Sequence, residues 1–276
     1  MPNKHVAEMA NSIRKLSLMM IYGAKSGHPG GCLSVADILA TLYFKEMNLR
    51  PEQPRWVERD RLILSKGHSC PALYAALALK GFFPVEELKG LRRSDHFLEG
   101  HPDVKIPGVD APSGSLGMGL SQGLGMALGA RFAKIHFRTY VVLGDGDMQE
   151  GSTWEAIMAA GHHKVSSLTA LLDANLLQGD GFVARQMNYY PRLVSKISSF
   201  LWQVIDIDGH DLVQISAAIK RARNEVDGPT FIICRTTKGR GVSFMENVPY
   251  WQGSIAIKDE ELEKALAELG GAKCAL

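Results

Sequence analysis

The residues best suited to chemistry lie at two turns, one at Gly144-Asp145-Gly146 and the other at Asn175. Each turn follows a short apolar run, 140–143 in the first case and 168–172 in the second. Such runs are typical of buried strands in a parallel sheet. About thirty positions separate Asp145 from Asn175, roughly one βαβ crossover, so we expect both side chains at the carboxyl edge of neighbouring strands.

A carboxylate and an amide oxygen at one sheet edge form part of a site for a hard cation. With one backbone carbonyl they leave room in an octahedral shell for phosphate oxygens and water, as Mg²⁺ prefers. Gly144 and Gly146 let the backbone approach a ligand, and open α/β sheets bind ligands at this edge. The pattern therefore indicates a magnesium-bridged diphosphate. The alternative is a strand-end turn in which Asp and Asn are only turn formers.

The elements that must position these residues alternate along the chain. Further strands are expected at 61–65, 202–207 and 230–234, and helices at 4–22, 33–47, from 71, 117–135, 153–163, 191–200, 211–226 and 259–269. This rhythm predicts an α/β fold, a mostly parallel sheet with helices on both faces. Ser34 is the expected cap of the second helix, and Ser152 with Glu155 is an expected capping box.

Glycines recur through the helix predicted at 117–135, and each costs roughly 1 kcal/mol relative to alanine. Close packing of the helix against backbone is the expected gain, and a dimer core is the alternative. Residues 81–113 are predicted to be a long, loop-rich segment of functional importance.

Composition excludes several classes of protein. The 276 residues are 46% hydrophobic and 22% charged, which predicts a globular protein with one sizeable α/β domain or two small ones. The net charge of +2 gives no argument for nucleic-acid or membrane binding. The sequence has no stretch of eighteen apolar residues. Its four cysteines are scattered and form no CxxC, so neither a zinc site nor a disulfide framework is expected. We expect a cytoplasmic protein.

Three histidines lie in glycine-containing turns. His28 is in Ser-Gly-His-Pro-Gly-Gly, His68 follows the strand predicted at 61–65, and His101 is in Gly-His-Pro-Asp. A turn from strand to helix points helix N-terminal amides at an anion, which favours a ligand near His68. Surface turns would be the ordinary explanation of each motif alone.

Together with Gly-Asp-Gly-Asp-Met-Gln-Glu-Gly, these motifs resemble those of transketolases, and the chain is similar over nearly its whole length to the N-terminal, diphosphate-binding subunit of a two-subunit transketolase. The resemblance implies a thiamine diphosphate-binding fold, with one diphosphate-type domain over residues 1–276. It implies thiamine diphosphate and Mg²⁺ (or Ca²⁺ or Mn²⁺) as cofactors, with the metal held by Asp145, Asn175 and the carbonyl of Leu177. The implied reaction is transfer of a two-carbon ketol unit from a ketose phosphate to an acceptor.

The resemblance also assigns roles to further residues. The catalytic residues it implies are His28, His68, His101, Gln252 and Glu150, where Glu150 matches an acidic residue in a network between paired cofactors. The cofactor-binding residues it implies are His68, Gly114, Ser115, Leu116, Gly144, Asp145, Gly146, Asn175 and Gln252.

Two departures from the family pattern stand out. Leu176 follows Asn175 where most relatives have glycine, so leucine must adopt a conformation that glycine tolerates. Gln252 stands where two-subunit transketolases usually have histidine, and an amide cannot carry a proton at neutral pH. The acceptor is therefore an aldose phosphate or something less usual, such as a carrier-bound thioester.

The glutamate that activates thiamine in this family belongs to a pyrimidine-binding domain, which ordinarily follows the diphosphate-binding one. We expect that domain and the C-terminal domain on a second subunit, in a heterotetramer of two copies of each chain. The alternatives are a subunit of a thiamine enzyme that decarboxylates a 2-oxo acid, and a non-catalytic scaffold subunit.

Overall fold

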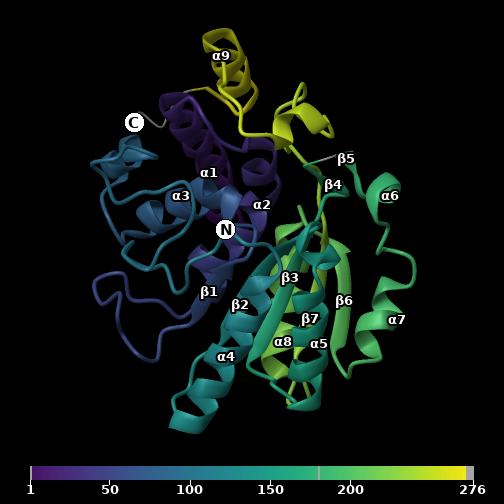
Figure 1. Cartoon of the computed structure of the whole chain (residues 1–276). Helices are drawn as coiled ribbons and strands as arrows, with labels where there is room; N and C mark the ends of the chain where they lie inside the picture. Colours follow the sequence, from purple (N-terminus) through teal and green to yellow (C-terminus); the bar gives the residue numbers. More distant parts are fainter. Residues whose placement is uncertain (1, 180, 272–276) are drawn as a thin grey trace.

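The computed structural model describes residues 2–179 and 181–271. At its centre is a parallel sheet with strand order β1-β2-β3-β7-β6, and a short antiparallel hairpin, β4-β5, follows β3 (Figure 1). The strands are β1 Arg61–Leu64, β2 Thr139–Gly144, β3 Leu168–Ala174, β4 Leu177–Gln178, β5 Gly181–Phe182, β6 Gln203–Asp208 and β7 Thr230–Arg235. Each pairing in the larger sheet is parallel, which confirms the predicted sheet type.

Helices cover both faces of this sheet, and Figure 1 shows α4 and α5 in front of it and α8 behind. The α-helices are α1 Pro2–Ala24, α2 Pro29–Thr41, α3 Cys70–Lys80, α4 Met118–Ala133, α5 Gly151–His162, α6 Val183–Gln186, α7 Leu193–Ser198, α8 Leu212–Asn224 and α9 Asp259–Glu268. A short π-helix, η1, spans Leu42–Glu46, and the 3₁₀ helices are η2 Gly67–Ser69, η3 Val85–Gly90, η4 Asp147–Gln149 and η5 Pro249–Gln252.

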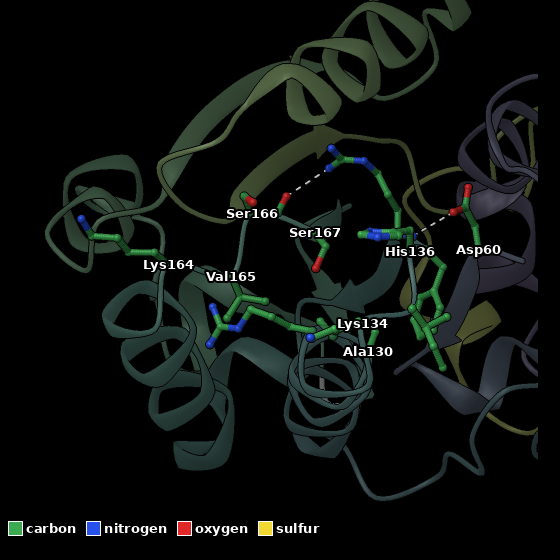
Figure 2. A pocket seen from close by; sticks show the side chains of 13 residues that line it. Asp60, Ala130, Lys134, His136, Lys164, Val165, Ser166 and Ser167 are labelled. Carbon is green, nitrogen blue, oxygen red and sulfur yellow. Dashed lines mark hydrogen bonds between the residues drawn. The ribbon is translucent and has the colours of Figure 1, made fainter. Parts of the chain in front are cut away.

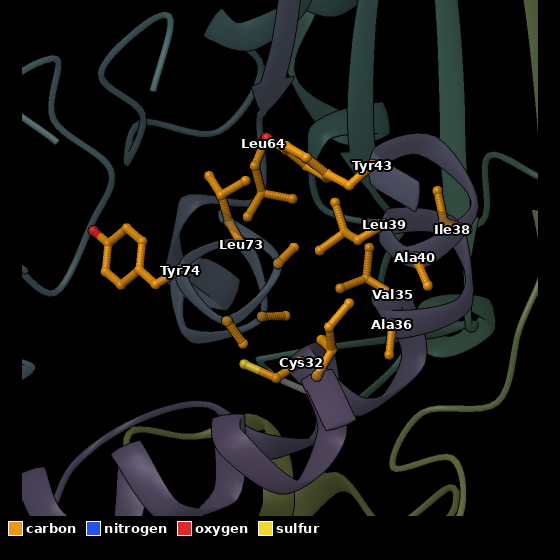
Figure 3. Close-up of a cluster of buried hydrophobic side chains, with 14 of the residues drawn as sticks. Cys32, Val35, Ala36, Ile38, Leu39, Ala40, Tyr43, Leu64, Leu73 and Tyr74 are labelled. Carbon is orange, nitrogen blue, oxygen red and sulfur yellow. The ribbon is translucent and has the colours of Figure 1, made fainter. Parts of the chain in front are cut away.

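The strands divide their side chains between two cores, because successive residues of a strand point to opposite faces. In β2, Val142 joins the core formed with α1, α2, α3 and α8, whereas Val141 joins the core formed with α4, α5 and α7. Figure 3 shows part of the first core, where Leu39, Tyr43 and Leu73 meet near the end of β1. Apolar side chains on both faces explain why the strands read as continuous hydrophobic runs.

The predicted start of the second helix is wrong. The helix α2 begins at Pro29, directly after His28, and Ser34 lies inside it rather than capping it. Proline suits the first turn of a helix because it has no N–H to satisfy there. Ser34 is fully buried and donates a hydrogen bond to Asp173 instead.

The predicted capping box of α5 is also wrong. The helix begins at Gly151 after the 3₁₀ turn η4, and Glu150 at its N-cap position makes no side-chain capping bond. The turn is held instead by Thr153, whose hydroxyl donates to the carbonyl of Asp147. A local contact between residues six positions apart thus replaces the cap that Ser152 and Glu155 predicted.

The glycines of α4 divide into two groups. A Cβ at Gly119 would lie 2.5 Å from the Ser65 side chain, and one at Gly123 would lie 2.4 Å from Val141, so these two confirm close packing on the sheet. A Cβ at Gly125 or Gly129 would meet nothing within 4 Å among the described residues. The dimer core that was the alternative explanation remains a prediction for this second pair.

Within residues 2–179 and 181–271, no helix is both long and apolar enough to cross a bilayer. Cys32, Cys70 and Cys234 are buried and free, while Cys274 lies outside the described residues.

Candidate active site at the carboxyl edge of the sheet

The two turns singled out from the sequence do meet. Strands β2 and β3 pair in parallel with Gly144 opposite Asp173, so the residues that follow leave the same edge of the sheet. Asp145 Oδ2 accepts the backbone N–H groups of Asn175 and Leu176, both at 3.1 Å. The Asp145 and Asn175 side chains are both buried. The predicted adjacency is therefore confirmed, whereas a metal at this place remains a proposal.

The second aspartate of the motif, Asp147, has a different task. Its carboxylate accepts the N–H of Gly144 at 2.8 Å and that of Gly117 at 2.7 Å, together with the hydroxyl of Ser65. Asp147 is fully buried and its oxygens are occupied by the protein. It therefore shapes the turn, and Asp145 is the aspartate that can offer oxygens to a ligand.

Leu176, directly after Asn175, adopts the left-handed conformation that we expected to be unfavourable for leucine. Leu176 has φ = +65°, in the left-handed region that glycine favours. The N–H of Leu177 donates to Asn175 Oδ1 at 3.2 Å, which closes the turn. The carbonyl of Leu177, expected as a metal ligand, accepts a hydrogen bond from Lys238 Nζ at 3.3 Å.

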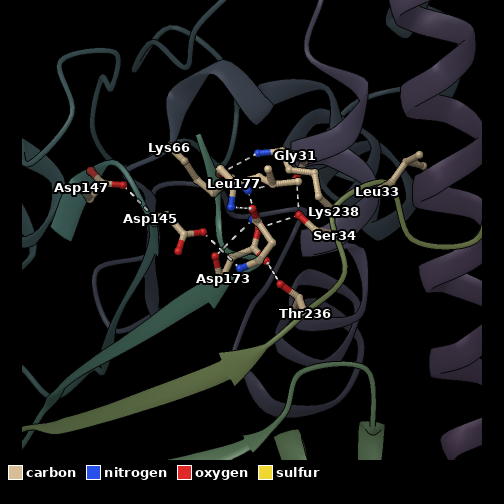
Figure 4. Close-up of polar contacts among 12 residues, drawn as sticks. Gly31, Leu33, Ser34, Lys66, Asp145, Asp147, Asp173, Leu177, Thr236 and Lys238 are labelled. Carbon is tan, nitrogen blue, oxygen red and sulfur yellow. Dashed lines mark hydrogen bonds and ion pairs between the residues drawn. The ribbon is translucent and has the colours of Figure 1, made fainter. Parts of the chain in front are cut away.

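A buried ion pair connects the helix α2, the end of β3 and the segments that follow β1 and β7 (Figure 4). Lys66, after β1, pairs with Asp173 at the end of β3 and also donates to the carbonyl of Gly31 at 3.1 Å. Asp173 accepts further hydrogen bonds from the hydroxyls of Ser34 and Thr236. The side chains of Lys66 and Asp173 are 2% and 0% exposed, so each charge depends on the other.

The pKa shifts of Asp173, at the end of β3, and Asp145, directly after β2, are opposite in direction. Burial acts to raise the pKa of Asp173, but Lys66 and the hydrogen bonds from Thr236 and Ser34 outweigh it and hold that pKa below its usual value. For Asp145 burial dominates and raises the pKa. Burial and the neighbouring Lys66 lower the pKa of Lys238. Asp145 and Lys238 are thus charges that the protein stabilises only in part, which is typical of functional sites.

The hydroxyl of Tyr189, from the loop between α6 and α7, donates to Asp145 Oδ1 at 2.8 Å. Burial and the Asp145 carboxylate raise the pKa of Tyr189, so it remains a donor at any physiological pH. Nothing in the motifs pointed to this tyrosine, because the contact spans loops that the sequence does not bring together.

The three histidines predicted from turn motifs lie near one another. The His28 and His68 rings are 5.0 Å apart between centroids in an edge-to-face arrangement. His28 Nδ1 lies 2.6 Å from the carbonyl of Gln252, which can only accept, so Nδ1 carries the proton and Nε2 is the ring atom that can accept one. Burial lowers the pKa of His28 and His68, and burial with Arg92 lowers that of His101.

His101 differs from the other two because it is exposed. It lines an open hollow with Arg92 and Arg93, and its ring lies against Gly114, where a Cβ would be 3.4 Å away. Glu99 also lines this hollow, so it presents charges of both signs, and the His28 and His68 rings are half-buried.

The remaining predicted residues are spread over two neighbouring surfaces. Leu116 lines the cleft, and a Cβ at Gly146 would lie 2.9 Å from its Cδ1. Gly114 and Ser115 line an adjacent hollow instead. Glu150 is exposed and packs beside Gly117, away from the cleft lining.

Gln252 also lines the cleft, at the end of η5. The residue is 7% exposed, yet its Oε1 has no hydrogen-bond partner among the described residues. A buried, unsatisfied amide oxygen costs about 1–3 kcal/mol unless a ligand satisfies it. Its position therefore fits a polar ligand bound in the cleft.

The cleft is small. Its volume is about 50 Å³, whereas pockets that enclose a small molecule usually measure about 300–1,000 Å³. The residues around it are Lys66, His68, Leu116, Gly144, Asp145, Gly146, Asp147, Asn175, Leu177, Gln178, Gly179, Lys238 and Gln252. Two lysines, a histidine and amide groups suit an anion, and the oxygens near Asp145 suit a cation. The donor set thus fits a metal-bound diphosphate for which this chain supplies one wall.

No cluster of three or more His, Cys, Asp or Glu side chains placed to hold a metal occurs among the described residues. The predicted ligand set contains a single side chain of these types, Asp145, beside an amide and a backbone carbonyl, so it differs in kind from such a cluster.

Comparison with known proteins agrees with this geometry. Residues 5–273 match the family described as "Transketolase, thiamine diphosphate binding domain". The chain is 42% identical over 261 residues to a 6-deoxy-6-sulfo-D-fructose transketolase subunit of Clostridium sp. (strain MSTE9), covering 94% of each chain. It is 37% identical over 256 residues to one of the subunits of the apulose-4-phosphate transketolase of Phocaeicola vulgatus, covering 93% of this chain and 90% of that one.

Among solved structures, the transketolase of Campylobacter jejuni superposes with a TM-score of 0.91 at 32% identity. The match covers 97% of this chain and 43% of that longer one. The chain belongs to the transketolase family, as an N-terminal subunit of transketolase type that contains the thiamine diphosphate-binding domain.

Proposed function

We propose that this chain binds thiamine diphosphate with a divalent cation at the carboxyl edge of its sheet and, with a second subunit, transfers a two-carbon ketol unit from a ketose to an acceptor. The observation that carries the proposal is the cleft itself. Asp145 and Lys238 are buried charges, and the Oε1 of Gln252 beside them has no partner in the described part of the chain. A protein retains such groups where a ligand completes them.

The cation would be Mg²⁺, held by Asp145, by the amide oxygen of Asn175 and by the carbonyl of Leu177. The Leu177 carbonyl accepts from Lys238, and because a carbonyl oxygen has two lone pairs it could bind a cation as well. Lys238 lies beside the cleft with Lys66 and His68, where all three suit the diphosphate oxygens. Burial removes competing water and strengthens these charge interactions.

When bound, thiamine diphosphate supplies a centre that stabilises a carbanion. The chain's own contribution is to orient the substrate and to move protons. His28 Nε2 is placed to accept a proton from a hydroxyl, because Nδ1 is committed to the carbonyl of Gln252. The lowered pKa of His28 and His101 keeps both rings neutral and available as acceptors at neutral pH.

The substrate would be a ketose with an anionic group at its far end. Arg92, Arg93 and Glu99 border the hollow that His101 lines. Arg93 pairs with Asp95 and Glu99 pairs with Lys105, so Arg92 is the cation that would hold the anion there while the carbonyl end of the substrate faces the histidines. The two similar subunits are named for a sulfonated ketose and for a phosphorylated one, so both kinds of anion are candidates here. Gln252 would contact the ligand through an amide that does not titrate.

The second subunit would carry the pyrimidine-binding domain and complete the pocket. A cleft of about 50 Å³ supports this, because it leaves most of a bound cofactor outside the chain. Gly114 and Ser115, in the adjacent hollow, would lie against the pyrimidine ring, and Glu150 would join a network between paired sites. A heterotetramer of two copies of each chain is the proposed assembly.

The test is to purify the chain with and without a partner subunit, add thiamine diphosphate and Mg²⁺, and identify the products from phosphorylated and sulfonated ketoses by mass spectrometry. We expect ketol transfer only from the pair of subunits. Activity of the chain alone at the full rate would refute the need for a partner. An Asp145→Ala chain in an unimpaired complex would show instead that the subunit is a scaffold.

A further inference from the structure

His210 lies between β6 and α8, outside the cleft, at a point where the backbone is pressed against the end of β7. The preceding Gly209 donates its N–H to the carbonyl of Arg235 at 2.8 Å. A Cβ at Gly209 would lie 2.5 Å from Thr236 Cγ2, so only glycine permits this approach. The approach carries the His210 ring to the loop that leaves β7.

The ring bridges two partners that require different roles from its nitrogens. His210 Nδ1 lies 2.7 Å from Asp37 Oδ2, and the backbone N–H of Thr237 donates to His210 Nε2 at 2.8 Å. An N–H can only donate, so Nε2 must be an unprotonated acceptor, and the ring proton must be on Nδ1. Asp37, paired with Arg14, is therefore the acceptor that fixes this tautomer.

The loop held in this way delivers a residue to the cleft. Thr237 is flanked by Thr236, which binds Asp173, and by Lys238, which is buried against the carbonyl of Leu177. Backbone bonds also secure the loop: the N–H of Thr236 donates to Ala174, that of Arg240 to Thr237, that of Gly239 to Gly30 and that of Asn247 to Lys238. None of these bonds uses the N–H of Thr237, which donates to His210, so the orientation of the peptide between Thr236 and Thr237 depends on His210.

We propose that His210 is a positioning residue: its neutral, Nδ1-protonated ring holds the N–H of Thr237 and thereby directs Lys238 into the cleft. The path runs from α1 through Arg14, Asp37 and His210 to the loop, and it links the helix layer behind the sheet to the site. The part that concerns ligand affinity depends on the proposed function, whereas the part that concerns the loop does not.

A matched pair of variants separates the two bonds. Glutamine places an acceptor near the position of Nε2, so His210→Gln keeps the bond to Thr237. Asparagine places its amide near Nδ1, so His210→Asn keeps the contact with Asp37 and loses Thr237. Hydrogen–deuterium exchange of the full-length chain, without any ligand, should show the Thr237 amide exchanging about tenfold faster in His210→Asn and near the wild-type rate in His210→Gln.

Calorimetry with Mg²⁺ and inorganic pyrophosphate supplies a second measurement, in which His210→Asn should bind about tenfold more weakly and His210→Gln should bind like wild type. His162→Asn is the control, because His162 is exposed at the far end of α5. If pyrophosphate binds to no form of the chain while the exchange difference persists, the proposed function fails and the positioning role stands.

Exchange rates that are equal in the two variants, whether slow or fast, would overturn the proposal, because the ring would then act only through its bulk. A measurement on the wild-type chain tests the proposal even if the variants fail to fold. Nitrogen-detected NMR of the wild-type histidine rings should show His210 protonated on Nδ1 alone at neutral pH. A proton on Nε2 would equally overturn the proposal.

Discussion

The sheet has a cleft at each edge, and the two differ in how their charged side chains are held. The carboxyl-edge cleft measures about 50 Å³, whereas a cleft at the amino edge measures about 690 Å³ and is lined by Arg131, Lys134, His136, Arg138 and Lys164 (Figure 2). At the amino edge Arg138 donates to the carbonyls of Ser166, Ala222 and Arg223, and Arg131 donates to that of His163.

The carbonyls of His163, Ala222 and Arg223 lie at or next to the C-terminal ends of α5 and α8, where positive charge stabilises the helix, and that of Ser166 lies in the segment before β3. Arg131 and Arg138 thus have a structural role in the larger cleft, which Asp60 also lines, and Lys134 and Lys164 are exposed to water. At the carboxyl edge Lys66, Lys238, Asp145 and Asp173 are all buried. Partly compensated buried charge, rather than volume, distinguishes the edge that we propose to be functional.

The largest expected effect comes from breaking the buried pair at the carboxyl edge. Asp173→Asn keeps the shape of the side chain but leaves Lys66 buried without its counter-ion, so the free energy of unfolding should fall by about 3–5 kcal/mol. Lys164→Gln is the control at the amino edge and should change it by less than about 0.5 kcal/mol. Urea denaturation of both variants measures the contrast, and equal losses would remove the distinction between the edges.

Asp145→Asn should separate binding from stability. It removes the proposed metal ligand, so Mg²⁺-dependent binding of thiamine diphosphate should weaken by more than about a hundredfold. In the ligand-free chain it removes a buried charge, but its NH2 group must face either the N–H groups of Asn175 and Leu176 or the hydroxyl of Tyr189, so the free energy of unfolding should stay within about 3 kcal/mol of wild type. Calorimetry and denaturant unfolding test the two parts, and unchanged affinity would exclude Asp145 as a metal ligand.

The same variant makes a pH prediction. Burial raises the pKa of Asp145 to about 6, above the unfolded value of about 3.9. The charged form therefore opposes folding above the folded-state pKa, and this cost disappears as the carboxyl is protonated. The stability of wild type relative to Asp145→Asn should rise as the pH falls from about 6 to about 4. A difference that stays constant over this range would contradict a raised pKa.

Arg138→Met tests whether the cations at the amino edge contribute to stability rather than to ligand binding. It removes hydrogen bonds to carbonyls of two chain segments, and the free energy of unfolding should fall by about 1–3 kcal/mol. Affinity for thiamine diphosphate in the complex should change less than about twofold, because the residue lies at the opposite edge of the sheet. A loss of affinity larger than the Asp145→Asn effect would show that the edges are coupled.

The sequence was sufficient for features that depend on local pattern. Buried strands read as apolar runs, and thirty residues between Asp145 and Asn175 predicted their adjacency, which the hydrogen bond from Asn175 to Asp145 confirms. The positive φ at Leu176 also follows from its place in the motif. Register and chirality of parallel strands leave few other arrangements, so these features were predictable.

Features that depend on tertiary contacts were not predictable. Ser34 and Ser152 look like caps, but Ser34 is used inside α2 to bind Asp173 and α5 begins without a side-chain cap. Lys66, Asp173 and Tyr189 carry no signal beyond their types, because their partners are distant in sequence. A lysine directly after a strand and an aspartate two residues before the predicted ligand were the available clues for the first two.

The smallest expected effect is at Lys134, the C-cap of α4, which has φ = +56°. Lys134→Gly relieves about 1 kcal/mol of left-handed strain and loses about 0.3–1 kcal/mol of interaction with the helix end, so stability should stay within about 0.5 kcal/mol of wild type. In 0.5 M salt the Debye length is roughly 4 Å, so salt screens the interaction that wild type makes with the helix end. The stability of the variant relative to wild type should therefore rise at this salt concentration. Phosphate that stabilises wild type but not Lys134→Gly would instead make the amino-edge cleft a binding site and reverse the comparison.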